Sequence, residues 1–461
     1  MPFCLRIAVY YFFSLFFAQA QKGFRIEGQI ANARPAALIL SQHYAGHLIP
    51  IDTALIGNDG KFVFQSNEPV PTGMCRVLGI GRGIELFVEE NKSFSLVADA
   101  RDILATIRFV NSPENTLFYD YQREVRRRYE KALNFRKQFG LKDDNDPRWQ
   151  NRYREFSEEI KGYVDSLYQR QPQLLATRFL KSFQEPKQPV LPVATLSAKD
   201  SAFLIGYHRQ HYFDHSFLSD ERMLYTSSMP ARFQKFLKMI PTIPPNDLLP
   251  LLEKVIDQTK GTVELRKYVV GQIAQLFELT ANKNYDEVYD FVTQKYVLAD
   301  PTLWDASTLQ KVKELQEIKK NLAVGSVFPE LIFKDLDNKA QSLAAIKSQY
   351  TILFFYDPGC SHCREAAPKL VELSKKYAQN ATVYAVSLDN NAQACRSFVQ
   401  DFGTSSFVNV RDTEGRTEFY KLGVINYPTI YLLDRDKKIK ARWLKIEELE
   451  TYLNDSADTQ P

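Results

Sequence analysis

The chain has 461 residues, of which 44% are hydrophobic and 25% charged, an ordinary balance for a globular protein of about three domains. Its 59 basic and 55 acidic residues leave a formal net charge of +4. The chain is therefore not strongly basic, so we expect neither nucleic acid nor an anionic membrane surface as a partner.

The N-terminus predicts a secretory signal peptide over residues 1–20. Arg6 supplies positive charge, residues 7–17 form an apolar stretch, and Ala18-Gln19-Ala20 fits a small-x-small cleavage site. The apolar stretch is about a dozen residues long, shorter than the ~20 that span a bilayer. We therefore expect an exported chain that is not an integral membrane protein after signal cleavage. An uncleaved membrane anchor is the alternative.

Residues 21–113 predict a β-sandwich-like domain. Short alternating segments are separated by turn sequences, of which Asn58-Asp59-Gly60 is the strongest. Cys75 falls in one of these segments and is expected to be a buried apolar residue. The expected strands are residues 24–30, 37–41, 48–56, 61–65, 75–79, 84–88, 93–98 and 103–110.

Residues 114–322 predict an α-helical domain, in which apolar residues recur at helical spacing between charged ones. The basic run Arg126-Arg127-Arg128 lies beside Glu124 and Glu130, which favours a solvated helix face over a nucleic-acid site. Residues 184–196 contain prolines 186, 189 and 192 and predict a linker or an exposed loop.

Three of the six histidines, His208, His211 and His215, are spaced at i, i+3 and i+7. On one helix they would share a face, where Asp214 or Asp220 could complete a site for a divalent metal. We favour a half-buried packing surface and expect no metal site here.

The most specific chemistry in the chain belongs to Cys360-Ser361-His362-Cys363. This motif follows an apolar run at residues 351–356 and precedes a segment, 364–379, that predicts a helix. A Cys-x-x-Cys at a strand-to-helix junction is the layout of a dithiol redox centre, because the spacing lets two sulfurs meet and the helix N-terminus favours a thiolate. On its own, the motif is also half of a zinc site.

A second signal lies downstream, where Tyr427-Pro428-Thr429 precedes a strand-like run at residues 430–434. A proline in this position predicts a turn or a sheet edge, with a cis peptide bond as one option. Together with the dithiol motif, Pro368 and the lead-in Gly325-Ser326-Val327-Phe328-Pro329, it resembles the thioredoxin superfamily. The closest likeness is to the exported TlpA/ResA-like branch of AhpC/TSA type, over residues 323–455.

This resemblance implies a thioredoxin fold, an α/β domain with a central mixed sheet flanked by helices, over residues 323–461. The whole chain is then a multidomain α+β protein. Its β domain carries Asp59-Gly60-Lys61-Phe62 and Phe87-Val88-Glu89, which resemble the N-terminal domain of exported thioredoxin-like proteins of the Bacteroidetes. The resemblance implies the periplasm or cell envelope of a Gram-negative bacterium.

The motif and the resemblance together predict a thiol–disulfide oxidoreductase. Cys360 should be the exposed nucleophile and Cys363, one turn into the helix, the resolving thiol, and the two should form the redox-active disulfide. His362 beside the nucleophile is expected to favour the thiolate and so to tune the acidity of Cys360, as in the oxidising DsbA-type motif that it resembles. The resemblance also implies that Pro428 is cis and that Tyr427, Pro428 and Thr429 bind the partner's backbone.

The expected partners are protein thiols and disulfides in the cell envelope, with a DsbD-like membrane electron donor implied by the resemblance. No cofactor is expected. Cys395, in a predicted helix, is expected to be a buried apolar residue, with a regulatory or resolving role as the alternative.

Three positions depart from the family pattern. Gly359 stands where many thioredoxins have a tryptophan, Phe354 stands where they have a buried acid, and Ala366 stands where TlpA/ResA-like proteins have a glutamate. Proton transfer to and from Cys363 therefore lacks its usual partner, and Glu365 or Asp357 are the candidate substitutes.

Three alternatives remain at this point. A peroxiredoxin-like peroxidase would need a Pro-x-x-x-Thr-x-x-Cys site, whose spacing no cysteine here has. A non-catalytic envelope protein could use the thioredoxin fold as an interaction module, which the intact dithiol disfavours. A zinc or metallochaperone site at Cys360 and Cys363 would lack a second pair of ligands at suitable spacing.

Overall fold

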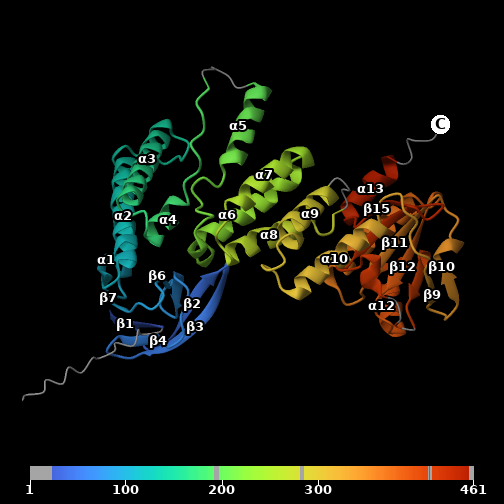
Figure 1. Ribbon diagram of the computed structural model, residues 1–461, viewed down its shortest axis with the longest axis horizontal. Coiled ribbons are helices and arrows are strands. Elements are labelled where there is room, and N and C mark those ends of the chain that lie inside the picture. The colour runs from blue at the N-terminus through green and yellow to red at the C-terminus, as the bar shows by residue number, and fades with distance from the viewer. Residues whose placement is uncertain (1–22, 192–196, 281–284, 414, 416–417, 456–461) are drawn as a thin grey trace, which may run out of the picture. The chain divides into compact units, whose positions relative to one another are not determined.

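The computed structural model describes residues 23–191, 197–280, 285–413, 415 and 418–455, so the expected signal peptide and Pro192 lie outside the described residues. The chain forms two compact units, whose helices and strands are labelled in Figure 1. The first unit holds the residues up to 238 and residues 258–265, and the second holds residues 239–257 and those from 266 onward. No helix among the described residues is both long and apolar enough to cross a membrane.

The first unit begins with two four-stranded sheets, which confirms the β-rich N-terminal region. One sheet has the strand order β4-β1-β7-β8 and the other has the order β3-β2-β5-β6. Ile26 and Ile30 of β1 are fully buried, with exposed residues between them, as expected of a strand with one face in a core. The strands are β1 (Phe24–Ala31), β2 (Ala36–Tyr44), β3 (His47–Ile56), β4 (Lys61–Ser66), β5 (Gly73–Leu78), β6 (Ile84–Val88), β7 (Phe94–Asp99) and β8 (Arg108–Val110).

The strand expected at residues 103–110 is wrong over its first half, which forms helix α1 (Ile103–Thr106). The carboxylate of Asp102 accepts a hydrogen bond from the backbone N–H of Ala105 at 3.1 Å. The hydroxyl of Thr106 donates to the carbonyl of Asp102 at 2.6 Å. These local bonds stabilise a capped helical turn where the apolar and β-branched residues by themselves predict a strand.

The helices of the first unit are α2 (Pro113–Gln138), α3 (Pro147–Arg170), α4 (Leu175–Lys181), α5 (Ala198–His211) and α6 (Ser228–Met239), with a 3-10 turn η1 (Glu221–Tyr225). Asn115 ties the start of α2 to β6, because its side chain accepts from the N–H of Phe87 at 2.7 Å and donates to its carbonyl at 2.8 Å. The adjacent Glu114 accepts hydrogen bonds from the backbone N–H groups of Leu175 and Ala176 and so caps α4. Residues 114–115 therefore join the sheet to the helices.

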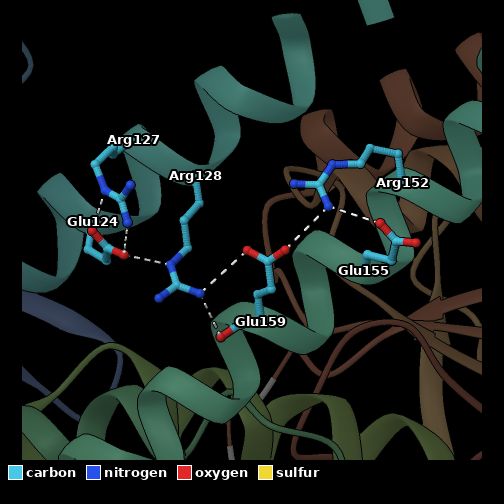
Figure 2. Close-up of polar contacts among 6 residues, drawn as sticks. All are labelled: Glu124, Arg127, Arg128, Arg152, Glu155 and Glu159. Carbon is cyan, nitrogen blue, oxygen red and sulfur yellow. Dashed lines mark hydrogen bonds and ion pairs between the residues drawn. The ribbon is translucent and has the colours of Figure 1, made fainter. Parts of the chain in front are cut away.

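The basic run of α2 belongs to an ion-pair network with α3 (Figure 2). Glu124 pairs with Arg127 at 2.6 Å and with Arg128 at 2.7 Å. Arg128 also reaches Glu159 of α3 at 3.4 Å, and Glu159 pairs in turn with Arg152 at 3.3 Å. These arginines lie on a partly solvated helix face with carboxylates as partners, as the alternating charges predict.

The second unit contains helices α7 (Pro245–Asp257), α9 (Asp286–Thr293) and α10 (Ala306–Asn321), and all of α8 (Glu264–Phe277) except its first two residues. A seven-stranded sheet follows, with the order β10-β9-β13-β12-β11-β14-β15. Helices α11 (Ser361–Lys376), α12 (Ala392–Phe402) and α13 (Ile446–Asp455) accompany the sheet. The strands are β9 (Ile332–Asp335), β10 (Ala340–Ser342), β11 (Tyr350–Tyr356), β12 (Ala381–Ser387), β13 (Val408–Arg411), β14 (Thr429–Asp434) and β15 (Ile439–Arg442). This mixed sheet with helices confirms the thioredoxin-like fold.

Strand β11 is an inner strand of this sheet and positions the dithiol. It pairs in parallel with β12 and antiparallel with β14, and all seven of its residues are buried. Phe354 of β11 shares one core with Leu370 of α11, Phe398 of α12 and Leu449 of α13. The carboxyl end of this strand therefore delivers residues 357–363 to a fixed place at the edge of a packed core.

Candidate functional site

A tight turn carries the chain from β11 into α11. The carboxylate of Asp357 accepts a hydrogen bond from the N–H of Gly359 at 2.7 Å, and its carbonyl accepts from the N–H of Cys360 at 3.1 Å. Cys360 is the N-cap residue of α11, with extended backbone angles of φ −76° and ψ 124°. The helix begins at Ser361, three residues before the predicted start at 364, and ends at Lys376, three residues before the predicted end at 379. The turn at Asp357 sets this start, and the sequence analysis had not recognised it.

Cys360 and Cys363 differ in exposure as the sequence predicts. Cys360 is half-buried at the helix N-terminus, whereas Cys363 is fully buried. Both are free thiols, so the structure shows the dithiol form. A sulfur at the N-terminus of a helix lies next to unpaired N–H groups and the positive end of the helix dipole.

The pKa of the Cys363 thiol is raised. Burial raises the pKa of the Cys363 thiol to about 12, and a hydrogen bond from the backbone of Asp357 offsets only part of that rise. The neighbouring Cys360 thiol and the negative charge of Asp357 raise the pKa of Cys363 further. At neutral pH, Cys363 is therefore a neutral thiol in the dithiol form.

The peptide bond between Tyr427 and Pro428 is cis, which confirms that part of the prediction. The thiol of Cys360 lies 3.8 Å from the carbonyl oxygen of Tyr427, within reach of a weak S–H···O hydrogen bond. The Thr429 hydroxyl donates to the carbonyl of Asn426 at 2.6 Å and closes the turn. The structure therefore brings Cys360 together with the three residues predicted to bind a partner.

A cavity of about 420 Å³ lies beside the dithiol. His362, Pro428 and Thr429 line it from the predicted site, and the side chain of His362 is exposed. Sequence analysis missed several other lining residues, namely Leu279, Lys369, Asn426, Trp443, Leu444, Lys445, Ile446 and Glu447. They come from α11, the turn before β14, the residues between β15 and α13, the start of α13 and the segment after α8, so no local motif could have identified them.

Phe354 and Ala366 stand at the two positions where the family has an acidic residue. Phe354 is fully buried in β11 and stacks on the ring of Tyr356 at a centroid distance of 5.3 Å. Ala366 is buried next to the cavity, and the neighbouring Glu365 is exposed at its rim. Of the two candidate substitutes, Asp357 is the one whose charge acts on Cys363.

The other two cysteines among the described residues are buried, as expected. Cys75 lies in β5, and burial raises the pKa of its thiol well above the usual range. Cys395 lies in α12, where its thiol donates to the hydroxyl of Ser387 at 3.1 Å, and burial raises its pKa as well. Neither environment favours a reactive thiolate.

The histidines at 208, 211 and 215 do not share one helix face, because α5 ends at His211. His208 contacts Glu185 at 3.3 Å, and His211 contacts Asp214 at 2.7 Å. Across the described ranges, no group of three or more His, Cys, Asp or Glu side chains could hold a metal ion.

Two family models match this chain, one near each end. The AhpC/TSA family matches residues 324–442, and a domain of unknown function, DUF4369, matches residues 24–118. Thioredoxin-like protein YneN of Bacillus subtilis is 30% identical over 121 residues, which cover 25% of this chain and 69% of YneN. The chain belongs to the thioredoxin-like AhpC/TSA family.

The chain is also similar to one further curated protein and to one solved domain. Thiol-disulfide oxidoreductase ResA of Geobacillus thermodenitrificans is 25% identical over 123 residues, which cover 26% of this chain and 70% of ResA. A solved domain of a possible thiol-disulfide isomerase from Cytophaga hutchinsonii is 30% identical and covers 30% of this chain and 98% of that domain, with a TM-score of 0.28. The family match and the curated relatives place the chain among the thiol–disulfide oxidoreductases of thioredoxin-like fold.

Proposed function

We propose that this chain is an exported enzyme that exchanges disulfides with partner proteins through Cys360 and Cys363. The observation that carries the proposal is the position of the half-buried Cys360 thiol, 3.8 Å from the carbonyl of Tyr427 and next to cis-Pro428, with Cys363 buried behind it. The backbone next to Pro428 is the expected docking edge for the partner's chain, which would bring the partner's disulfide to Cys360.

The proposed exchange has two steps. The thiolate of Cys360 attacks one sulfur of the partner disulfide, which forms a mixed disulfide and releases the other partner sulfur as a thiolate. Cys363 then loses its proton and attacks the sulfur of Cys360. This step forms the Cys360–Cys363 disulfide and releases the second partner thiol, so that the partner gains two electrons and the enzyme loses two. Run in reverse, the same steps oxidise a partner dithiol.

The second step depends on removing the proton of Cys363, whose pKa burial raises to about 12. Asp357 is the proposed proton acceptor, because its carboxylate acts electrostatically on Cys363 and lies in the turn that ends at Cys360. His362 is proposed to favour the thiolate of Cys360, since it lies in the first turn of α11 beside the cavity.

The proposed setting is the cell envelope. The signal-like sequence at residues 1–20 supports export, and the family supports protein thiols and disulfides as partners. Turnover in one direction needs a continuing supply of electrons, for which a DsbD-like membrane donor is the proposed source.

Trapping of the mixed disulfide tests the proposal. Purified Cys363→Ser protein is mixed with a disulfide-bonded protein such as insulin, and the products are separated without reductant. We expect a covalent complex through Cys360 that dithiothreitol releases, whereas Cys360→Ser should give none. Cys395→Ala is the matched control, because it removes another buried cysteine and should behave like the wild type. Absence of any complex with Cys363→Ser, together with no insulin reduction by the wild type, would overturn the proposal.

A further inference from the structure

Trp443 has an unusual backbone for so large a side chain. It follows directly after β15 and has a φ of +53°, in the left-handed region that bulky residues rarely adopt. Its indole N–H donates to the carbonyl of Gly423 at 3.1 Å, and its side chain lines the cavity beside Pro428. Surrounding contacts must therefore hold this residue in place.

A buried ion cluster provides those contacts. The guanidinium of Arg442 lies 4.2 Å from the centre of the Trp443 ring, and the ammonium of Lys319 lies 5.5 Å from it. Arg442 is fully buried and Lys319 is 4% exposed, and both pair with the carboxylate of Asp286 at the start of α9. Arg442 also donates to the carbonyls of Lys319 and Leu322 at the end of α10, at 2.7 and 2.8 Å.

The cluster connects helices α9 and α10 to the strand that carries Trp443. Lys319 also donates to the carbonyls of Phe277 and Glu278, at 3.1 and 3.0 Å, and so fixes the end of α8. Leu279 follows directly and lines the same cavity as Trp443. Residues of the helical segment 266–322 therefore shape the space next to the dithiol in two ways, through Leu279 directly and through Asp286 and Lys319 indirectly.

The lining of the cavity indicates what it would accept. Leu279, Trp443 and Ile446 give it an apolar wall. Of the charged residues that line it, Lys369 and Glu447 pair with each other at 2.7 Å. A charged side chain would have to give up water for this apolar wall, whereas an aliphatic or aromatic side chain would gain by burial.

We propose that Trp443 is a specificity-determining residue of the dithiol site, held in position by Asp286, and that it selects partner disulfides with an apolar residue next to the half-cystine. This inference rests on the proposed function and adds the substrate class to it. A partner whose backbone docks at Pro428 would place that neighbouring side chain against Trp443 and Leu279. The helical segment then acts as a selector of partners as well as a support for the fold.

The test uses three disulfides. Two are disulfide-bonded peptides that differ only in the residue beside one half-cystine, leucine in one and serine in the other, and the third is glutathione disulfide. The variants are Trp443→Ala, Trp443→Phe and Asp286→Asn. Two matched controls lie elsewhere in the same unit: Trp304→Ala removes a tryptophan whose indole donates to the carbonyl of Tyr296 at 3.0 Å, and Glu253→Gln breaks an ion pair with Lys295 at 2.5 Å.

We expect the wild type to prefer the leucine peptide roughly tenfold in KM, a typical effect for one aromatic anchor residue. Trp443→Ala should lose this preference mainly through a higher KM for the leucine peptide, with the reduction potential of the dithiol unchanged. Trp443→Phe should keep most of the preference, Asp286→Asn should lose part of it, and the two controls should keep all of it.

Persistence of the preference in Trp443→Ala would overturn the inference, as would an equal loss in Trp304→Ala. A parallel loss of activity on all three disulfides in both Trp443→Ala and Trp443→Phe would also overturn it, because that result shows a purely structural role. Inactivity of the wild type on every disulfide would instead contradict the proposed function, on which the inference rests.

Discussion

The buried thiol of Cys363 gives a quantitative prediction for its reactivity. With a pKa of about 12, compared with an ordinary value of 9.0, Cys363 carries roughly 1000-fold less thiolate at pH 7 than a free cysteine does. In the Cys360→Ser variant, which loses the smaller contribution of Cys360 to this pKa, we expect the acidity alone to slow the reaction of Cys363 with iodoacetamide by up to about 1000-fold relative to an unstructured cysteine peptide. Peptide-resolved mass spectrometry separates its adduct from those of Cys75 and Cys395.

The pH dependence distinguishes acidity from access. Limited access lowers the alkylation rate by the same factor at every pH, whereas a high pKa makes the rate rise about tenfold per pH unit up to pH 10. Cys363→Ser is the matched variant, in which the half-exposed Cys360 should react faster than Cys363 does in its counterpart. A rate for Cys363 that levels off below about pH 9.5 would refute the argument that burial keeps this thiol protonated.

Three further predictions concern Cys363, His362 and Arg442. Between pH 8 and pH 10, the free energy of unfolding of the dithiol form should fall by about 1.4 kcal/mol, because the Cys363 thiol has a pKa near 9.0 in the unfolded chain and near 12 in the folded one. Cys363→Ala should not show this loss, and urea unfolding of both proteins measures the difference. Stability from this group is thus complete below pH 9 and declines until the pH passes about 12. His362→Ala should lower the reduction potential by about 30 mV if His362 favours the thiolate tenfold, and an unchanged potential would show that it only faces solvent. Arg442→Met should lower the free energy of unfolding by roughly 3–5 kcal/mol, because it breaks a buried ion pair with Asp286; a loss below 1 kcal/mol would contradict this role.

Local patterns predicted most of the β domain and the position of the dithiol. Alternating burial in β1 and the uniformly apolar β11 are visible in sequence because each depends on the strand's own residues. The cysteine spacing and Pro428 are equally local, and the burial of Cys363 followed from its place one turn into a helix. These features need no knowledge of distant parts of the chain.

Features that depend on capping or on distant contacts could not be predicted in this way. Helix α1 depends on hydrogen bonds made by Asp102 and Thr106, and the early start of α11 depends on the turn at Asp357. Asp286 meets Arg442 across 156 positions of sequence, so the support of Trp443 has no local signal. The three histidines would share a face only on one continuous helix, and α5 ends at His211, before His215.

The redox titration of the dithiol tests the central claim most directly. The wild-type protein is equilibrated in glutathione buffers of increasing potential, quenched with acid and alkylated, and the cysteine peptides are identified by mass spectrometry. We predict one reversible two-electron transition in which Cys360 and Cys363 become linked to each other while Cys75 and Cys395 remain thiols. The absence of a Cys360–Cys363 disulfide at every potential, or its formation with Cys395 in place of Cys363, would contradict the account.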